Sequence, residues 1–580
     1  MTPTIFKNNV IRIVLCIGII LIHNSSGEKV KKNINLYYDL QSPPCRAVLL
    51  TLEALNLEFN LIRLRLLLSE QLSDDFRKIN SLHTLPVIQD GDFVLSDSHA
   101  IIVYLVRKYG GKKDHPLFPN DPKLQAQVNQ RLHFDNGTLF PAFTIQYNPW
   151  IYFNVSKTDE REEKIHEALV FLENVLKKSP WTAGESMTVA DFSLVATITT
   201  LKVAGVEMKK YDKINEWLIK CSTSMDGYQK ANQEGIDFII DMIKRLDKKF
   251  KRSPPTKSPQ YPRIPAHHNL IKVGGAPQHY WAHTNCVPKQ VAGVDLKKYD
   301  KIFKRFIKCT NTMDGYAVAN QEGINELEAT LEFVNENVIR PLGFMVIINM
   351  LTIKKQKVEK NINLYYDPIS PPCRAVLLTL EALNLKFNLI YIHLLDSEQL
   401  TENFRKINSL HTVPVIEEGD FVLSDSHAII VYLVREYGGK DDHPLYPNDP
   451  EIQAQVNQRL YFDDGTLYLA FRRQYNPWIY RNIPKTEEGE NKIHEALRFL
   501  ENVLKKSPWA AGESMTVADF SLVASISTFK VAGVDLKKYD NINEWFTKCE
   551  NKMDGYKEAN QAGIDVTDKM LISLNKKSAN

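Results

Sequence analysis

Residues 33–80 read NINLYYDLQSPPCRAVLLTLEALNLEFNLIRLRLLLSEQLSDDFRKIN, and this stretch decides the fold. Short β-rich runs alternate with helical periods along it, and the alternation continues to residue 109. The predicted strands cover 34–38, 59–64, 85–88 and 93–95, and the predicted helices cover 44–55, 70–79 and 97–109. The first crossover requires a parallel pair of strands, whereas the short turn at Asp90-Gly91 requires an antiparallel pair. The order βαβαββα therefore predicts a mixed sheet.

The same stretch returns at 361–408 with 10 differences in 48 positions, at an offset of 328 residues. The register holds without a gap as far as Gly235 in one copy and Gly563 in the other. A third, partial copy at about 291–323 repeats only the tail of a unit. Solenoid repeats have about 20 to 50 residues, so a unit as long as these is expected to fold as a complete module.

Beyond residue 121 each unit is helical in pattern. In the first unit the apolar periods cover 124–139, 164–177, 189–203 and 214–221. Thr188 stands three residues before Asp191, which is the spacing of a capping box, and Thr516 and Asp519 repeat it. Such a box starts a buried helix, so we assign these four residues to folding rather than to chemistry.

The composition excludes several classes of protein. With 44% hydrophobic and 24% charged residues, the chain is typical of globular proteins and not of disordered or collagen-like ones. Its 72 Lys and Arg against 69 Asp and Glu leave a formal charge of +3. In a chain of this length, so small a net charge disfavours binding of nucleic acid. Seven cysteines are too few for a disulfide scaffold, so we expect reduced thiols.

The segments outside the two units leave alternatives open. Lys7 and Arg12 precede an apolar run over 13–22, which is the layout of a signal peptide or a short anchor. A comparable run over 344–353 precedes the second unit, so both runs also fit translated flanking sequence from two neighbouring genes joined into one. The basic, Pro-rich stretch after residue 245 indicates a solvated linker, and we predict no metal site in the chain.

Several motifs now stand at fixed places in each unit: SPPCR at 42–46, HTLPV at 83–87, SDSHA at 96–100 and the capping box in the helical half. Together they resemble a cytosolic glutathione transferase, most closely the insect delta/epsilon type. The resemblance covers most of each full unit. It implies an α/β thioredoxin-like domain plus an all-α helical domain, duplicated in tandem.

This resemblance sets the predicted domain boundaries. They are 1–30 for a possible signal, anchor or untemplated leader, 31–112 for a thioredoxin-like glutathione-binding domain, 118–245 for an all-α C-terminal domain, 246–290 for a linker, 291–335 for the partial copy of the C-terminal domain end, 336–358 for a second linker, 359–440 for the second thioredoxin-like domain and 446–575 for the second all-α domain. We call 31–245 the first repeat and 359–575 the second repeat.

Ser42 and Ser370 are the predicted catalytic residues. Each lies just before a helix that begins with prolines, where helix amides and the helix dipole favour an anion. A hydroxyl that donates to a bound thiolate lowers the pKa of the thiol, and the resemblance implies this role; simple helix capping is the alternative. Serine also stands where a thiol-disulfide oxidoreductase has its attacking cysteine, so disulfide exchange is disfavoured.

The remaining glutathione contacts are implied by the resemblance. Pro86 and Pro414 would follow cis bonds, and the backbone of Leu85 and Val413 would pair with the cysteinyl part. His83 and His411 would contact the glycyl end. Asp97, Ser98, Asp425 and Ser426 would hold the γ-glutamyl end at a helix N-terminus, although the family usually has glutamate before this serine. Helix capping by Ser96 is the alternative at that position.

The second substrate is expected against the helical half. The predicted electrophile-binding residues are Phe143, Tyr147, Tyr152, Phe471, Arg472, Tyr475 and Tyr480. An aromatic stripe is often core, so the pocket is what the resemblance implies rather than what the pattern shows. Arg472 replaces Thr144 of the first repeat, and related epsilon-type enzymes have arginine there.

We therefore expect an enzyme that activates the glutathione thiol as thiolate and conjugates it to hydrophobic electrophiles, as in detoxification. The alternatives are a non-catalytic binding or interaction module and a fusion of two neighbouring genes. The expected partners are glutathione, as co-substrate with no other cofactor, and a hydrophobic small molecule, with no nucleic acid and no membrane. We expect a pseudo-dimer within the chain or a homodimer, in the cytoplasm, or secreted or in the endoplasmic reticulum if residues 1–27 act as a signal peptide.

Overall fold

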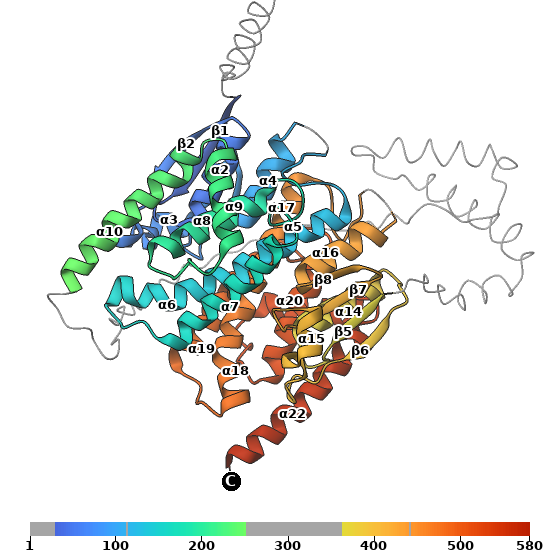
Figure 1. The fold of residues 1–580 in the computed structure, drawn as a ribbon. Helices are drawn as coiled ribbons and strands as arrows, with labels where there is room; N and C mark the ends of the chain where they lie inside the picture. The colour runs from blue at the N-terminus through green and yellow to red at the C-terminus, as the bar shows by residue number, and fades with distance from the viewer. Residues whose placement is uncertain (1–29, 112–113, 251–361, 440–441, 580) are drawn as a thin grey trace, which may run out of the picture. The chain divides into compact units, whose positions relative to one another are not determined.

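A computed structural model of the chain describes residues 30–111, 114–250, 362–439 and 442–579 (Figure 1). The partial copy over 291–335 and the second linker fall outside these residues, and so does the predicted leader over 1–30 except for Val30, which begins the first strand. The last helix of the first repeat runs to Phe250, past residue 245, where the first linker was expected to begin. The rest of that linker is also outside the described residues.

The thioredoxin-like half of the first repeat follows the predicted order. Its elements are β1 (Val30–Tyr38), α2 (Pro43–Ala54), β2 (Leu57–Arg63), the 3₁₀ turns η1 (Leu66–Leu68) and η2 (Glu70–Leu72), α3 (Asp74–Ile79), β3 (Val87–Asp90), β4 (Phe93–Ser96) and α4 (Ser98–Tyr109). The sheet order is β2-β1-β3-β4. β1 and β2 are parallel, whereas β3 is antiparallel to both β1 and β4, so the predicted mixed sheet is confirmed.

The helical half of the first repeat contains more helices than the periodicity indicated. Its elements are α5 (Pro122–Phe134), the π-helical turn η3 (Asp135–Leu139), α6 (Phe140–Phe153), α7 (Asp159–Leu176), α8 (Val189–Val203), α9 (Asp212–Ser224), the π-helical turn η4 (Gln229–Gln233) and α10 (Glu234–Phe250). Neither α6 nor α10 was among the predicted periods. α6 contains Pro149 and is apolar on several faces, which hides its helical period.

The second repeat folds in the same way. Its thioredoxin-like half contains β5 (Asn363–Tyr366), α14 (Pro371–Ala382), β6 (Asn388–Tyr391), η7 (Glu398–Leu400), α15 (Glu402–Ile407), β7 (Val415–Glu418), β8 (Phe421–Ser424) and α16 (Ser426–Tyr437). Its helical half contains α17 (Pro450–Phe462), η8 (Asp463–Leu467), α18 (Tyr468–Arg481), α19 (Glu487–Leu504), α20 (Val517–Val531), α21 (Asp540–Lys552), η9 (Lys557–Gln561) and α22 (Ala562–Ala579).

The capping box starts α8, the helix at the centre of the first helical half. The Thr188 side chain and the Asp191 carboxylate satisfy each other's backbone amides, and Asp191 is completely buried. The carboxylate also accepts bonds from the Thr182 amide at 2.9 Å and from Nε1 of Trp217 at 3.0 Å. The Asp191 carboxylate therefore binds groups from three segments of the helical half, as its assignment to folding predicted.

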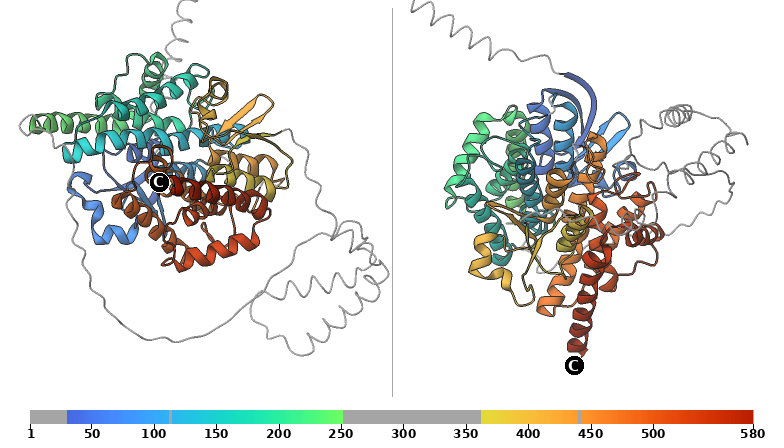
Figure 2. Two further views of the ribbon diagram at one scale, coloured as in Figure 1. Left: turned by 90° about the horizontal axis from the view of Figure 1, so that it is seen from below. Right: turned by 90° about the vertical axis from the view of Figure 1, so that its right-hand side faces the viewer.

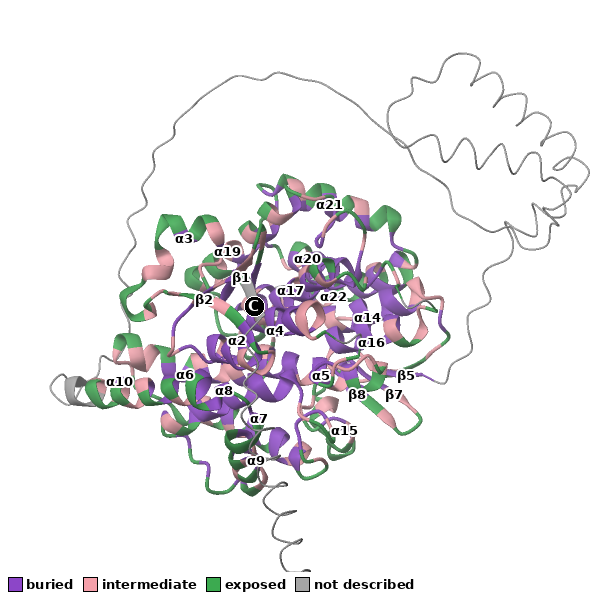
Figure 3. Cartoon of the chain, turned by 90° about the horizontal axis from the view of Figure 1, so that it is seen from above, coloured by how far each residue is buried: buried purple, intermediate pink, exposed green. Residues whose placement is uncertain are grey.

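The two repeats contact each other through their buried helices (Figures 2 and 3). α4 packs against α17, and α16 packs against α5, so each thioredoxin-like half faces the helical half of the other repeat. Nε2 of Gln130 donates to the Ser424 carbonyl at 2.9 Å, and Nε2 of Gln458 donates to the Ser96 carbonyl at 2.9 Å. Tyr461 belongs to the hydrophobic core of the first repeat. The contact between the repeats is therefore pseudo-symmetric.

Candidate active site

The strand register brings three separated segments of the first repeat to one end of its sheet. Tyr37 pairs with Val87, and Val87 pairs in turn with Ser96. Both pairs are antiparallel, so the residues after Tyr37, before Val87 and after Ser96 lie at the same end. We call this end the site edge. It carries the loop before α2, the turn before β3 and the start of α4.

The second repeat has an equivalent site edge. Tyr365 pairs with Val415, which pairs with Ser424. The predicted catalytic and glutathione-binding residues of each repeat therefore gather at one end of one sheet, although they lie up to 56 positions apart in the sequence. Two helices begin at this end in each repeat: α2 and α4 in the first repeat, and α14 and α16 in the second. Backbone amides at such ends favour anions.

Ser42 ends the loop after β1 and caps α2. Its backbone is extended, with φ −82° and ψ 115°, and its Oγ accepts a hydrogen bond from the Cys45 amide at 3.4 Å. Ser370 has almost the same backbone, with φ −83° and ψ 114°. Both serines are 7% exposed. A serine hydroxyl that accepts such a bond still has its own hydrogen to donate, so each can serve an anion at the positive end of the helix dipole.

A buried aspartate fixes the loop that holds Ser42. The backbone oxygen of Asp39 accepts from the Ser42 amide at 3.1 Å, and its carboxylate accepts from the Leu66 amide at 2.9 Å. Arg63 adds an ion pair to this carboxylate at 3.3 Å. The sequence analysis missed Asp39. In the second repeat Asp367 likewise accepts from the Leu394 amide at 3.0 Å.

A buried arginine fixes the same loop from the other side, and the sequence analysis missed it as well. Arg46 is completely buried in α2 and donates to the Leu40 carbonyl at 3.1 Å. It also donates to the Ala196 carbonyl at 2.7 Å and to Oδ1 of Asn232 at 2.9 Å. Burial lowers the pKa of Arg46 to about 9. The arginine therefore ties the serine loop to the helical half of its own repeat.

The chain approaches this arginine so closely that glycine is required. A Cβ at Gly235 would lie 2.4 Å from Cδ of Arg46 and 2.6 Å from the Leu40 carbonyl oxygen. Gly563 stands in the same place beside Arg374, which is also completely buried. The sequence shows that both repeats contain this arginine and this glycine. That the two residues contact each other depends on the tertiary fold.

The expected cis bonds are present at Leu85–Pro86 and Val413–Pro414. The predicted strand over 85–88 begins only at Val87, so the cis bond lies in the turn before β3 and not inside the strand. The backbone of Leu85 and Val413 consequently stands beside the site edge of its repeat, where an extended peptide could pair with it.

The helix N-cap at the site edge is Asp97, and the alternative of capping by Ser96 is wrong. The Asp97 carboxylate accepts from the His99 amide at 2.9 Å and from the Ala100 amide at 3.1 Å, with φ at +75°. A positive φ is uncommon for a residue with a side chain and marks a backbone held by its surroundings. Asp425 repeats this conformation with φ at +79°. Ser98 and Ser426 are 4% exposed at the first turn of their helices.

The two predicted glycyl-end histidines differ in their partners. Nε2 of His83 lies 2.8 Å from Oε1 of Glu495, which belongs to the second repeat. The hydrogen bond from His83, together with Lys492, lowers the pKa of Glu495 to about 2. Burial instead lowers the pKa of His411. The first histidine is therefore tied to the other repeat, a contact that the sequence analysis did not predict.

With this geometry described, the comparisons with known proteins are informative. The model of the glutathione S-transferase N-terminal domain matches residues 36–113 and 364–441, and the model of the C-terminal domain matches 137–224 and 464–552. Both models thus match both repeats.

The chain belongs to the glutathione transferase family.

Solved structures of insect enzymes resemble one repeat at a time. A delta-class glutathione transferase of Nilaparvata lugens is 44% identical over 37% of this chain and 99% of its own length, with a TM-score of 0.35. An epsilon-class glutathione S-transferase of the housefly, Musca domestica, is 39% identical over 37% of this chain and 98% of its own, also with a TM-score of 0.35. A glutathione transferase of Bombyx mori is 38% identical with the same coverage.

The aromatic residues among the predicted electrophile-binding residues of this glutathione transferase fall into two groups. Phe143, Tyr147, Phe471 and Tyr475 are at most 6% exposed and belong to the hydrophobic cores. In each repeat the phenylalanine and tyrosine stack on each other, with ring centroids 5.0 Å and 4.2 Å apart. Their burial favours a role in the hydrophobic core over a role in a substrate pocket.

Two of the predicted tyrosines are accessible. Tyr152 is 44% exposed and Tyr480 is 51% exposed. Burial of the hydroxyl, followed by the charge of Asp39, raises the pKa of Tyr152, and Asp367 acts on Tyr480 in the same way. These two residues remain the best candidates for contact with a second substrate.

Arg472 gives the second repeat a charge that the first repeat lacks. Its guanidinium carbon lies 5.7 Å above the ring of Tyr468. Burial raises the pKa of Tyr468, while the charges of Arg472 and Arg374 lower it. In the first repeat Thr144 occupies the equivalent place, and its Oγ1 donates to the Pro141 carbonyl at 3.1 Å.

A cavity of about 820 Å³ lies between the first thioredoxin-like half and the second helical half, apart from the serine loops. Asn80 and Ser96 line it from the first repeat, and Gln458, Arg459 and Lys505 line it from the second. Among the described residues, the helices are all too short or too polar to cross a membrane.

Proposed function

We propose that each repeat binds glutathione at its site edge, and that this transferase conjugates the activated thiolate to hydrophobic electrophiles. The observation that carries the proposal is the duplicated site edge. Each copy brings a buried serine at a helix N-terminus, a cis-proline turn and an Asp-Ser helix start to one end of one sheet.

The proposed chemistry begins with the thiol. The Ser42 or Ser370 hydroxyl donates a hydrogen bond to the glutathione sulfur, and the proton of the thiol leaves to solvent. A free thiol has a pKa of about 8.5, and each unit of lowering requires about 1.4 kcal/mol of selective stabilisation of the thiolate. One hydroxyl donor and one helix N-terminus together supply an effect of this size. The thiolate then attacks the electrophile.

The other contacts orient the tripeptide. The backbone of Leu85 or Val413 pairs with the cysteinyl part, and the amides at the start of α4 or α16 receive the γ-glutamyl carboxylate. Asp97 or Asp425 receives the ammonium group. Because both aspartates already accept two backbone amides, they are held in place before the ligand binds.

The test uses the full chain with Ser42→Ala, Ser370→Ala and the double variant. We expect calorimetry to show two glutathione sites, and the absorbance of the bound thiolate to be lost from the altered repeat while binding persists. Conjugation of a model electrophile should fall to background in the double variant. Ser73→Ala is the matched control, because Ser73 also caps a helix with its side chain but is not one of the proposed glutathione contacts.

The outcomes separate the alternatives. Glutathione binding without thiolate or conjugation would support a non-catalytic binding module, and the absence of binding would overturn the proposal. We further propose that the protein acts in the cytoplasm, because the described cysteines, Cys45, Cys221, Cys373 and Cys549, are all free thiols, as a reducing compartment allows. Cell fractionation that finds the chain in the secretory pathway would contradict this.

A further inference from the structure

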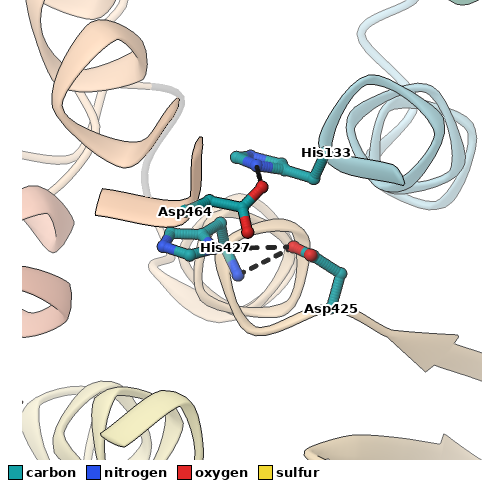
Figure 4. A group of neighbouring side chains, drawn as sticks. All are labelled: His133, Asp425, His427 and Asp464. Carbon is teal, nitrogen blue, oxygen red and sulfur yellow. Dashed lines mark hydrogen bonds and ion pairs between the residues drawn. The ribbon is translucent and has the colours of Figure 1, made fainter. Parts of the chain in front are cut away.

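Four side chains from the two repeats converge where α5 meets the start of α16. They are His133 near the end of α5, Asp425 and His427 at the start of α16, and Asp464 in η8 (Figure 4). One nitrogen or carboxylate oxygen of each lies within 4.8 Å of the others. We call this group the His2Asp2 cluster. It draws on residues that are up to 331 positions apart, which explains why the sequence analysis predicted no metal site.

The cluster contains a buried nitrogen without a hydrogen bond. His133 is 3% exposed, and its Nδ1 makes no hydrogen bond with the described residues. This nitrogen faces Oδ2 of Asp464 at 3.5 Å, a distance for an ion pair (Figure 4). Leaving a polar atom buried and unsatisfied costs about 1–3 kcal/mol. A cation bound between His133 and Asp464 would satisfy both groups.

The ring of His427 is fixed by hydrogen bonds to one of its nitrogens, as is usual for metal-binding histidines. Nε2 of His427 contacts Oγ of Ser521 at 2.9 Å and Oδ2 of Asp463 at 3.4 Å. This support fixes the ring. Its Nδ1 lies 3.4 Å from Oγ of Ser426 and 3.8 Å from Oδ1 of Asp425, so a bound metal ion would replace the serine contact. A histidine that ligates a metal through one nitrogen commonly bonds a carboxylate through the other.

The carboxylates are also oriented. Asp425 is fixed as the N-cap of α16 by two backbone amides on Oδ1, the oxygen that also faces His427, and the proposed contact with the glutathione ammonium group is assigned to its other oxygen. Asp464 accepts a hydrogen bond from Nδ2 of Asn136 at 3.4 Å, so its direction is set by the first repeat. Two imidazoles and two carboxylates supply a mixed nitrogen and oxygen donor set, which suits zinc and similar divalent transition metals better than calcium or magnesium.

We propose that the His2Asp2 cluster binds one divalent transition-metal ion such as Zn²⁺ and thereby links the two repeats. Tetrahedral zinc bonds imidazole nitrogen at about 2.0–2.1 Å, so binding requires rotations of the side chains, including the stacked rings of His133 and His427, that bring the four donor atoms closer together. The ion would join α5 of the first repeat to α16 and η8 of the second.

The chain contains its own control for this proposal. The pseudo-symmetric place, 328 positions away for each residue, holds Asp97, His99, Tyr461 and Asn136. Tyrosine replaces one histidine there, and asparagine replaces one aspartate. That group lacks two of the four donors, so the proposal predicts one ion per chain and not two.

The experiment measures Zn²⁺ binding to the full, metal-stripped chain by calorimetry, with thermal unfolding and the visible spectrum of bound Co²⁺ as further readouts. We expect one site per chain, a rise in unfolding temperature and a tetrahedral cobalt spectrum. The variant His133→Tyr with Asp464→Asn copies the residues of the pseudo-symmetric place, so it should fold. Removal of two ligands should weaken Zn²⁺ binding by more than about tenfold.

A matched pair of single variants adds a second measurement. Asp425→Asn should weaken Zn²⁺ binding, whereas Asp97→Asn, the same change at the pseudo-symmetric place, should leave it unchanged; asparagine also caps helices well. Zn²⁺ binding that survives in the His133→Tyr, Asp464→Asn variant would place the ion elsewhere in the chain and overturn the proposal. So would equal effects of the two asparagine variants, or a wild-type chain that binds no Zn²⁺.

Discussion

At the scale of single residues, Ser42 and Cys45 lie about one helical turn apart but differ in exposure to ligand and in reactivity. The hydroxyl of Ser42 stands at the N-terminus of α2, whereas the Cys45 thiol is completely buried. Burial raises the pKa of Cys45, and likewise that of Cys373, to about 12. These thiols stay protonated where a catalytic cysteine would be a thiolate, which agrees with the expected absence of disulfide exchange.

This leads to a prediction about thiol reactivity. Cys45 and Cys373 should resist iodoacetamide in the native chain at neutral and mildly alkaline pH, because the reactive thiolate forms only as the pH approaches 12. Peptide mass spectrometry after labelling checks this residue by residue. The unfolded chain is the control and should be labelled at every cysteine. Rapid native labelling of either thiol would contradict the burial seen here.

The residues of the candidate site were predictable to different degrees. Ser42, Pro86 and Asp97 stand in short motifs, so their places at a helix start or a turn follow from local sequence. Arg46 could not be assigned in this way, because it bonds Asn232, which is 186 positions away. The contact of His83 with Glu495 spans 412 positions and two repeats. Local patterns carry no information on such distant partners.

At the scale of helices and strands, most differences from the sequence prediction lie where a capping residue or a turn interrupts the hydrophobic periodicity. The helix predicted over 70–79 divides into the 3₁₀ turn η2 and α3, because Ser73 is extended and caps α3 with its side chain. The strand predicted over 85–88 starts two residues late, after the cis bond. Sequence periodicity identified the type of these elements, while capping and turn geometry decided where they begin.

The contact between α2 and α8 gives a prediction at this scale. Arg46→Met should lower the stability of the first repeat by about 3 kcal/mol, because each buried acceptor that loses its donor costs about 1–3 kcal/mol. Urea unfolding and hydrogen exchange of the serine loop measure the effect. Arg65→Met is the control, because Arg65 is exposed and bonds Glu70. A loss no larger than that of the control would show that Arg46 does not hold the loop.

At the scale of the whole molecule, the contacts between the repeats are only nearly symmetric. Gln130 and Gln458 make equivalent bonds to Ser424 and Ser96. Glu495 bonds both Lys492 and His83, however, whereas the equivalent Glu167 bonds Lys164. A homodimer of identical subunits has no such differences. Transcript sequencing across residues 244–360 would show whether one message encodes both repeats.

The contact of Glu495 with His83 predicts a dependence of stability on pH. The folded pKa of about 2 lies below the ordinary value of 4.5, so this carboxylate stabilises the fold above pH 4.5 and loses that effect as the pH falls toward 2. Glu495→Gln should therefore cost about 1 kcal/mol at the higher pH, since the pair is partly exposed, and the cost should disappear as the pH falls through 2. Denaturant unfolding across this range measures it. Glu167→Gln is the matched control, and equal effects of the two changes would contradict the cross-repeat contact.

The last asymmetry concerns catalysis and rests on the proposed function. Arg472 lies over Tyr468 in the second repeat, and the charges of Arg472 and Arg374 both act on that tyrosine. A positive charge near the thiolate favours the anion and the negative charge that develops on the electrophile. Thr144 supplies neither effect in the first repeat. We therefore expect the second repeat to be the faster one.

Kinetics on a model electrophile tests this expectation in the full chain. Ser370→Ala should remove most of the activity and Ser42→Ala little of it. Arg472→Thr should lower kcat/KM by about tenfold or more, since it removes charge stabilisation that is strongest in the transition state. Thr144→Arg is the reciprocal variant and should raise the activity that remains in Ser370→Ala. If both serine variants lose equal activity, or Ser42→Ala loses more, the arginine does not set the rate.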